Sequence, residues 1–284
     1  MKNNYLYFLF LVLLSSCASL KDKEETKNLA IMTYNVKISG DSGLKHWSNR
    51  KDHVVKQMKE KEVDVYILQE PLKHQIDYIQ SKFNNFSVIG EPRTSDKYLR
   101  TRNAIFFDNN KFKVKENKTF WVSETPLVES IGWDAYGARI VTYALLENRV
   151  TKDKFYVFNV HLDSKGSKSK IKGVQLIDEW VKKVNTHNYP VIIGGDFNSK
   201  ESSEPIVWFR DYYSDAKTTS ITVPKGPLGT FNYFNNRTEN HKYRLDYIFV
   251  NENVKVNSYE VLQDKYGEMY PSDHYPVFVE LTLL

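Results

Sequence analysis

Two short polar segments carry residue types that could act together on one ligand. Residues 195–198 (GDFN) follow the apolar run 191–193, and residues 272–275 (SDHY) precede the apolar run 277–279. Asp196 and His274 therefore stand at the ends of predicted buried strands, where the backbone fixes side chains well. Asp and Asn also follow strands simply because they form turns. Two such segments in one chain favour a shared site over two unrelated turns.

Further polar residues stand at other predicted strand ends, namely Asn35, Glu70, Asn159, His161, Asp246 and Asp273. Alternate residues of a strand point to the same face, which pairs Asn159 with His161 and Asp196 with Asn198. The set holds carboxylates, amides and imidazoles but no Cys, so it suits Mg²⁺, or Mn²⁺, better than a structural zinc. One carboxylate with several waters is the usual Mg²⁺ arrangement, and Glu70 is the first candidate for it.

The elements that would position these residues are short strands and a few helices. Ser48 is expected to cap a helix that contains Val54 and Met58, and further helices are expected over residues 72–83 and 171–184. Strands are predicted at residues 29–36, 63–68, 86–89, 103–107, 112–122, 139–146, 155–160, 191–193, 244–250, 254–262 and 276–283. Helices alternate with strands in each half, which favours an α/β fold of two mixed β-sheets packed face to face with helices outside.

The N-terminal residues are typical of a targeting signal rather than of the folded core. Residues 5–14 are almost purely apolar, too short to span a bilayer but typical of a secretory signal. The run ends in residues 14–17 (LSSC), which resemble the bacterial lipobox and hold the single Cys of the chain; a buried, inert Cys is the alternative. We therefore expect a lipoprotein signal peptide over 1–16, lipidation of Cys17, a charged flexible tether over 17–28, and one domain over 29–284.

Composition narrows the class of protein only slightly. Of the 284 residues 41% are hydrophobic, enough for a large core, and the formal net charge of +5 suits an anionic partner such as a phosphate ester. With the predicted anchor, the expected location is an exported, membrane-bound lipoprotein on the periplasmic or cell-surface face.

Six motifs in this chain resemble, in the same order, those of the endonuclease/exonuclease/phosphatase superfamily, the deoxyribonuclease-I-like metal-dependent phosphoesterases. They are residues 33–36 (TYNV), 68–70 (LQE), 159–162 (NVHL), 195–198 (GDFN), 244–247 (RLDY) and 272–274 (SDH). The resemblance spans nearly the whole domain. It implies a four-layer α/β-sandwich and hydrolysis by direct attack of water on phosphorus.

The same resemblance implies roles for the residues of these motifs. Glu70 binds Mg²⁺, Asn35 helps to build the metal and phosphate site, and Asp273 lies beside the metal.

For the remaining residues, the resemblance implies contact with water and phosphate. Asp196 orients or deprotonates the attacking water, Asn198 holds that water or a phosphate oxygen, and His161 contacts the phosphate. His274 stabilises the transition-state charge or shuttles a proton, with Asp246 orienting its ring. Whether Asp196 or His274 is the general base stays open at this point.

Two more segments resemble a bacterial exported subgroup of the superfamily and its eukaryotic deadenylase branch. They are residues 120–126 (FWVSETP) and 132–135 (GWDA), followed by Arg139. Trp133 could offer a stacking face and Arg139 a phosphate clamp, with Asn159 as a further substrate contact; a packed Trp and a locally paired Arg are the alternative. Residues 100–103 (RTRN) are basic where that subgroup often has a Glu, and the hallmark segments of inositol-polyphosphate 5-phosphatases are missing.

The leading hypothesis is a Mg²⁺-dependent phosphodiesterase or nuclease, anchored to a membrane and monomeric. Its partners would be a phosphate-ester substrate, whether nucleic acid, nucleotide or lipid headgroup. The alternatives are a phosphomonoesterase, a sphingomyelinase-like phosphodiesterase, and a non-catalytic lipoprotein that binds phosphorylated ligands.

Overall fold

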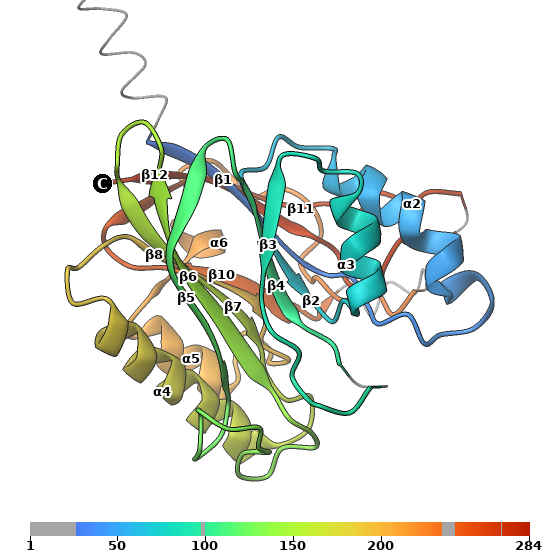
Figure 1. The fold of residues 1–284 in the computed structure, drawn as a ribbon, viewed down its shortest axis with the longest axis horizontal. Helices are drawn as coiled ribbons and strands as arrows, with labels where there is room; N and C mark the ends of the chain where they lie inside the picture. The colour runs from blue at the N-terminus through green and yellow to red at the C-terminus, as the bar shows by residue number, and fades with distance from the viewer. Residues whose placement is uncertain (1–26, 98–99, 235–241, 268) are drawn as a thin grey trace, which may run out of the picture.

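Two six-stranded β-sheets form the centre of the molecule in the computed structural model, which describes residues 27–97, 100–234, 242–267 and 269–284 (Figure 1). The first sheet has the order β11-β12-β1-β2-β4-β3 and the second the order β5-β6-β7-β8-β10-β9. The first comprises β1 (Asn28–Asn35), β2 (Val65–Gln69), β3 (Phe86–Ile89), β4 (Asn103–Asp108), β11 (Val254–Val261) and β12 (Val277–Leu283). The second comprises β5 (Phe112–Trp121), β6 (Ile140–Asn148), β7 (Lys154–His161), β8 (Val191–Asp196), β9 (Ser214–Asp215) and β10 (Asp246–Val250).

Helices cover the outer face of each sheet. The helices α2 (Trp47–Met58) and α3 (Lys73–Gln80) pack on the first sheet, while α4 (Ser167–Val184) and α5 (Glu204–Arg210) pack on the second (Figure 1). A short helix α6 (Ala216–Thr219) and a 3-10 turn η1 (Gly43–Lys45) complete the described elements. The order helix, sheet, sheet, helix confirms the predicted four-layer α/β-sandwich with two mixed sheets.

Successive side chains of a β-strand point to opposite faces of the sheet, and this alternation explains both the core and the site. In β1, Leu29 and Ile31 point into the layer between the sheets, whereas Met32 and Tyr34 point toward the helices. Continuing the inner series along β1 leads from Ile31 to Asn35. The inner series likewise ends in polar residues at Gln69 of β2, at Asn159 and His161 of β7, and at Asp196 of β8. One end of the hydrophobic layer between the sheets is therefore lined by polar side chains.

A few elements differ from the predictions. The residue that caps α2 is His46, not Ser48, and its ring nitrogen Nδ1 accepts a hydrogen bond from the Ser48 N–H at 3.3 Å. The prediction had no helix at α5, although Pro205 in its first turn is a recognised helix-start signal. Because α5 is only seven residues long, it buries little more than Ile206 and Phe209. Two apolar positions are too few to show the helical spacing on which the prediction relied.

The predicted signal peptide and Cys17 lie outside the described residues, and β1 begins at Asn28, the last residue assigned to the tether. Within the part of the chain that the structure describes, no helix combines the length and apolar character that crossing a bilayer would require.

Candidate active site

Strand direction brings the predicted site residues to one end of the sandwich. The parallel pairs β1–β2 and β7–β8 have their carboxyl ends at the same edge, where Asn35 lies opposite Gln69 and His161 opposite Asp196. The antiparallel strand β10 begins there, because Asp246 is also the register partner of Asp196. Antiparallel pairing of β12 with β1 places the residues that precede β12 at this same end. In Figure 1, β1 starts near the top of the molecule and runs downward.

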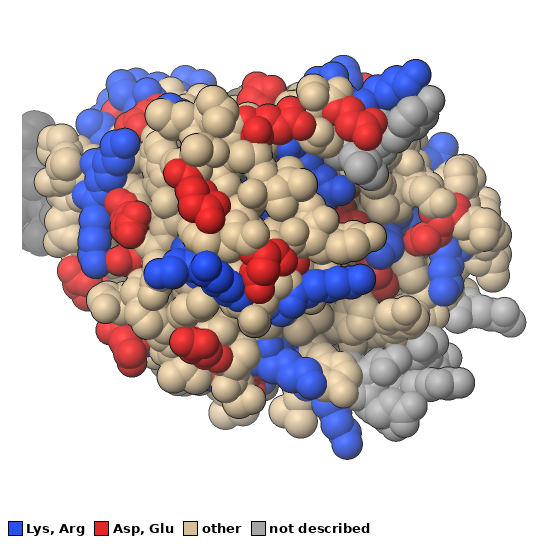
Figure 2. All heavy atoms as spheres, turned by 90° about the horizontal axis from the view of Figure 1, so that it is seen from below, with Lys and Arg blue, Asp and Glu red and all other residues tan. Residues whose placement is uncertain are grey.

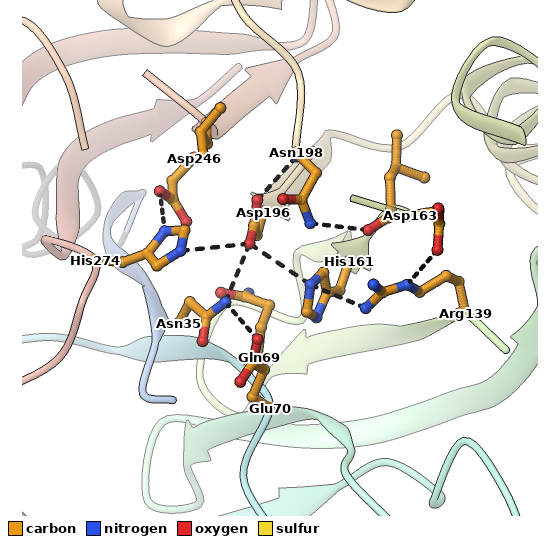
Figure 3. Close-up of polar contacts among 12 residues, drawn as sticks. Asn35, Gln69, Glu70, Arg139, His161, Asp163, Asp196, Asn198, Asp246 and His274 are labelled. Carbon is orange, nitrogen blue, oxygen red and sulfur yellow. Dashed lines mark hydrogen bonds and ion pairs between the residues drawn. The ribbon is translucent and has the colours of Figure 1, made fainter. Parts of the chain in front are cut away.

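Asp196 is the centre of the arrangement (Figure 3). Its Oδ2 atom lies 3.1 Å from the amide nitrogen of Asn35, 3.6 Å from Nε2 of His161 and 3.8 Å from Nε2 of His274. Its Oδ1 atom accepts the backbone N–H of Asn198 at 2.8 Å. Burial raises the pKa of this carboxyl above its usual range, although His274 acts in the opposite direction. A raised pKa makes Asp196 a better proton acceptor than an exposed carboxylate.

His274 is held by Asp246 on the side of the ring that faces away from Asp196. Its Nδ1 atom lies 2.8 Å from Oδ2 of Asp246, and the same oxygen accepts the hydroxyl of Thr230 at 2.5 Å. Burial alone would lower the pKa of His274, but the charges of Asp246 and Asp196 outweigh it and raise the pKa to about 10. The ring is therefore an imidazolium at neutral pH, with Nε2–H directed at Asp196.

Glu70 and Asn35 form the first-sheet side of the site. Glu70 follows β2 in a left-handed backbone conformation (φ 70°), which costs energy for a residue other than Gly and is often found at functional sites. Its Oε2 atom accepts the Ile38 N–H at 3.0 Å, and its Oε1 atom lies 3.3 Å from the amide nitrogen of Asn35. Burial opposes ionisation, but His161, Lys37 and these hydrogen bonds lower the pKa of Glu70 to about 2.

The donor set fits a hard divalent cation. Glu70 is ionised, and each of its oxygens uses only one lone pair in the contacts above, so it can still coordinate a cation. Asp196 and Asp273 supply further carboxylates, and sulfur ligands are absent from the described site. Asn35 turns its amide nitrogen toward Glu70 and Asp196, while its Oδ1 accepts the Lys37 N–H. Its observed contacts therefore orient the two carboxylates, and its predicted part in the metal and phosphate site stays a prediction.

A second group of potential ligands consists of Asp196, Asp246 and His274, whose ligand atoms lie within 4.8 Å of one another. Two of these three are hydrogen-bonded to each other, and the ring carries a positive charge at neutral pH. A metal cation bound at this group would be repelled by the positive charge of His274. Glu70 is therefore a better candidate ligand for a divalent cation than the Asp–Asp–His group.

His161 belongs to a different chain of contacts. Nη1 of Arg139 lies 3.2 Å from Nε2 of His161, and because Arg only donates, Nε2 accepts and the ring proton sits on Nδ1. Burial, followed by the charge of Arg139, lowers the pKa of His161 to about 4, so the ring is neutral near pH 7. Arg139 is itself held by Asp163, whose Oδ2 lies 3.3 Å from Nε. Asp163 was not among the predicted residues, although it stands two positions after His161.

The loop after β8 depends on unusual backbone angles. Gly195 has φ 147°, and a Cβ atom added there would lie 1.9 Å from the carbonyl oxygen of Val160, so only glycine fits. Asn198 is left-handed (φ 46°), and its amide nitrogen donates to the carbonyl of Leu162 at 3.0 Å. These contacts fix Asn198 beside Asp196, as predicted from the spacing in the segment 195–198.

Asn159, which the sequence suggested as a substrate contact, makes its hydrogen bonds within the protein. It is fully buried, its Oδ1 accepts from Gln69 at 2.9 Å, and its amide nitrogen donates to the carbonyls of Leu68 and Ala104, both at 2.9 Å. All three partners belong to the first sheet, whereas Asn159 belongs to the second. Asn159 therefore ties the two sheets together beneath the site, while its role as a substrate contact stays a prediction.

Trp133 shows packing contacts. Its side chain is partly buried against the core between the second sheet and its helices. Its backbone N–H donates to a carboxylate oxygen of Glu124 at 3.1 Å. The next residue, Asp134, accepts the N–H groups of Lys168 and Ser169 in the first turn of α4. The segment 132–135 therefore docks a loop onto α4, the structural alternative given for Trp133.

Two cations near Asp273 were also missed. Nζ of Lys37 lies 3.0 Å from Oδ2 of Asp273. Arg50 is fully buried and donates to backbone carbonyls, including those of Val36 and Pro271. A signal for Arg50 was present, since it stands four residues before Val54 and eight before Met58, on the buried face of α2.

Comparison with known proteins agrees with this geometry. A solved mannosyl-6-phosphatase from Bacteroides thetaiotaomicron is 31% identical, has a TM-score of 0.83 and matches 90% of this chain and 100% of that one. TDP2 from D. rerio with a single-strand DNA product is 17% identical, with a TM-score of 0.70, over 90% of this chain and 99% of that one. An uncharacterized protein of Acanthamoeba polyphaga mimivirus is 27% identical over 82% of this chain and 91% of its own length. Residues 32–274 match the Endonuclease/Exonuclease/phosphatase family, so this chain belongs to that family of phosphoesterase hydrolases.

Proposed function

We propose that this protein is a Mg²⁺-dependent hydrolase whose preferred substrate is a phosphate monoester on a small molecule. The observation that carries phosphoester hydrolysis is the position of Asp196, with one oxygen between Asn35 and the imidazolium of His274. A phosphoryl group beside that oxygen would meet a proton acceptor and a proton-bearing cation together.

The residues divide the reaction between them. Asp196 accepts a proton from water as the water oxygen forms a bond to phosphorus and the ester P–O bond breaks. The leaving oxygen departs with the bonding electron pair and takes up a proton from solvent. His274 stays protonated and stabilises the charge that develops on the phosphoryl oxygens, because Asp246 keeps it an imidazolium. Asp196 rather than His274 is thus the general base.

Glu70, with Asp273 as its neighbour, would hold the divalent cation. When bound, Mg²⁺ supplies Lewis-acid stabilisation of phosphoryl charge. Asn35 donates from its amide nitrogen to both Glu70 and Asp196, so one side chain fixes the distance between the metal carboxylate and the base.

The cations around the site favour a monoester over a diester. A phosphate monoester carries up to two negative charges near neutral pH, because its second pKa lies near 6. Arg139 is fixed beside His161, and burial together with the charge of Arg139 lowers the pKa of Arg93, so two guanidinium groups share this side of the site. The likeness to a mannosyl-6-phosphatase at 31% identity supports the same choice.

A phosphodiesterase or nuclease, the leading prediction from the sequence, is the second candidate. The fold is shared with TDP2 bound to a DNA product, and the net charge is +5. Yet the described Lys and Arg residues on the site end of the molecule are interspersed with Asp and Glu (Figure 2). A polymer-binding groove would favour a continuous basic stripe.

We also propose that the enzyme is an exported lipoprotein attached through Cys17. Strand β1 then runs from the end nearer the anchor, at Asn28, to the catalytic end at Asn35, about 23 Å at ~3.3 Å per residue. The proposed attachment and the site therefore lie at opposite ends of β1.

A substrate panel tests the proposal. Purified protein with Mg²⁺ is assayed on mannose 6-phosphate, p-nitrophenyl phosphate, bis-p-nitrophenyl phosphate, single-stranded DNA, RNA and sphingomyelin vesicles. We expect the monoesters to turn over fastest and Glu70→Ala and Asp196→Asn to lose that activity. Faster cleavage of the diester substrates would select the second candidate. Full activity in either variant, or no hydrolysis of any substrate with phosphate still bound, would overturn the proposal in favour of another site or a non-catalytic binding protein.

A further inference from the structure

In the segment that follows β1, every backbone N–H and C=O group of Val36, Lys37 and Ile38 is hydrogen-bonded, five of the six to side chains. Val36, Lys37 and Ile38 donate from their N–H groups to Gln69 O, Asn35 Oδ1 and Glu70 Oε2, at 3.0 to 3.1 Å. Their three carbonyls accept from Arg50, at 2.5 Å for Val36, 2.6 Å for Lys37 and 3.1 Å for Ile38. Gln75 donates to the Lys37 carbonyl as well, at 2.9 Å. The conformation of this segment is therefore fixed by its surroundings.

Lys37 adopts a left-handed backbone conformation (φ 59°), which is energetically unfavourable for a residue other than Gly. Its side chain is 28% exposed and its ammonium lies 3.0 Å from Oδ2 of Asp273, whose side chain is 9% exposed. The charge of Lys37 also acts on Glu70. One ammonium thus serves two carboxylates that come from different parts of the chain, at the place where the proposed function requires a divalent cation.

We propose that Lys37 is an internal counter-cation of the metal site, which competes with the divalent metal for Asp273 and Glu70 and so weakens metal binding. This inference rests on the proposed function, because it takes Glu70 as the metal carboxylate. The ammonium balances the two carboxylates before metal binds. A cation that enters must displace it from Asp273 or bind against its repulsion.

Electrostatics gives the direction of the effect. Two positive charges a few ångströms apart oppose each other in a partly buried site, where screening by water is weaker than at the surface. Couplings between sites of this kind commonly change affinity by ~5–150-fold. Removing the charge of Lys37 should therefore tighten Mg²⁺ binding by roughly tenfold.

Calorimetric titration of the metal-free protein with Mg²⁺, and separately with Mn²⁺, tests this. Lys37→Met removes the charge and keeps the length of the side chain, while Lys37→Arg keeps the charge. Lys111→Met is the matched control, since it removes a Lys–Asp ion pair of 2.6 Å with Asp64, which precedes the start of β2 at the other end of that strand. A second readout is the increase in Tm on adding Mg²⁺.

We expect Lys37→Met to bind about ten times more tightly than the wild type, and to gain a larger Mg²⁺-induced increase in Tm. Lys37→Arg and Lys111→Met should stay within about threefold of the wild type. Unchanged or weaker binding in Lys37→Met, while Glu70→Ala still abolishes metal uptake and hydrolysis, would overturn the role of Lys37 and leave the proposed function intact. If neither the wild type nor Lys37→Met takes up metal, both proposals fail.

Discussion

The imidazole of His274 and the carboxylate of Asp246 meet at 2.8 Å, between residues 28 positions apart in the chain. Asp246 opens β10 and His274 precedes β12, so the pair joins the two sheets at the catalytic end of the sandwich. The carboxylate fixes the ring so that Nδ1 points at Asp246 and Nε2 at Asp196. The same contact sets both the orientation of the ring and its charge.

Asp246→Asn should lower kcat by about 10²–10³, with a smaller change in KM. The amide keeps the shape of the side chain but removes the charge that keeps His274 protonated. Steady-state kinetics on the best substrate of the panel measures the effect, and circular dichroism checks the fold. Asp108→Asn, at the far end of β4, is the control and should retain wild-type kcat. A kcat within threefold of the wild type in Asp246→Asn would contradict the role given to the pair.

The pH profile of kcat/KM should show its alkaline limb near pH 10. The pKa of His274 is raised to about 10, so the imidazolium persists until the pH rises through that value. The same shift stabilises the fold: the contribution is complete below the unfolded pKa of ~6.5 and is lost as the pH rises toward 10. In Asp246→Asn the alkaline limb should move toward neutral pH. A wild-type limb at pH 7 would mean that His274 is not the group that must carry the proton.

The sequence predicted the fold and most of the site because both depend on one periodicity. Asn35, His161 and Asp196 end strands whose inner positions farther from the site are apolar, so their convergence follows from strand pairing. Roles were harder to predict than positions. Asn159 lies two residues before His161 on the same face of β7. It is therefore farther from the end of the strand, where its neighbours are backbone carbonyls of the other sheet.

Partners from loops and helices could not be predicted from strand patterns. Thr230 reaches Asp246 from a loop sixteen residues upstream, and Lys37 reaches Asp273 across the whole length of the sequence. Such contacts depend on how distant segments are placed in the folded protein, and a local sequence pattern does not reveal that placement. Asp163 shows the intermediate case, where the residue stood beside a recognised motif but its partner Arg139 lay on another strand end.

Arg139→Ala should raise KM for a phosphate monoester at least tenfold and leave the fold intact, because a guanidinium held against His161 and Asp163 would be lost from the phosphate side of the site. The charge of Arg139 also lowers the pKa of His161, so this pKa should rise in the variant. NMR titration of the His161 ring measures the second effect. Arg149→Ala, in the exposed turn between β6 and β7, should change neither quantity. An unaltered KM would move the phosphate away from Arg139.

Asn159→Ala should destabilise the protein by about 3–5 kcal/mol, because it removes three buried side-chain hydrogen bonds, to the carbonyls of Leu68 and Ala104 and from the amide of Gln69. Urea unfolding measures the loss. Asn257→Ala is the comparison, since Asn257 makes one side-chain hydrogen bond to Thr282 at the partly exposed edge strand β11 and should cost less than about 1 kcal/mol. In the folded fraction of Asn159→Ala, KM should remain close to the wild-type value. A large rise in KM with unchanged stability would restore Asn159 as a substrate contact, whereas the reverse would place its function in holding the two sheets at the separation that lets Asp196 meet Asn35.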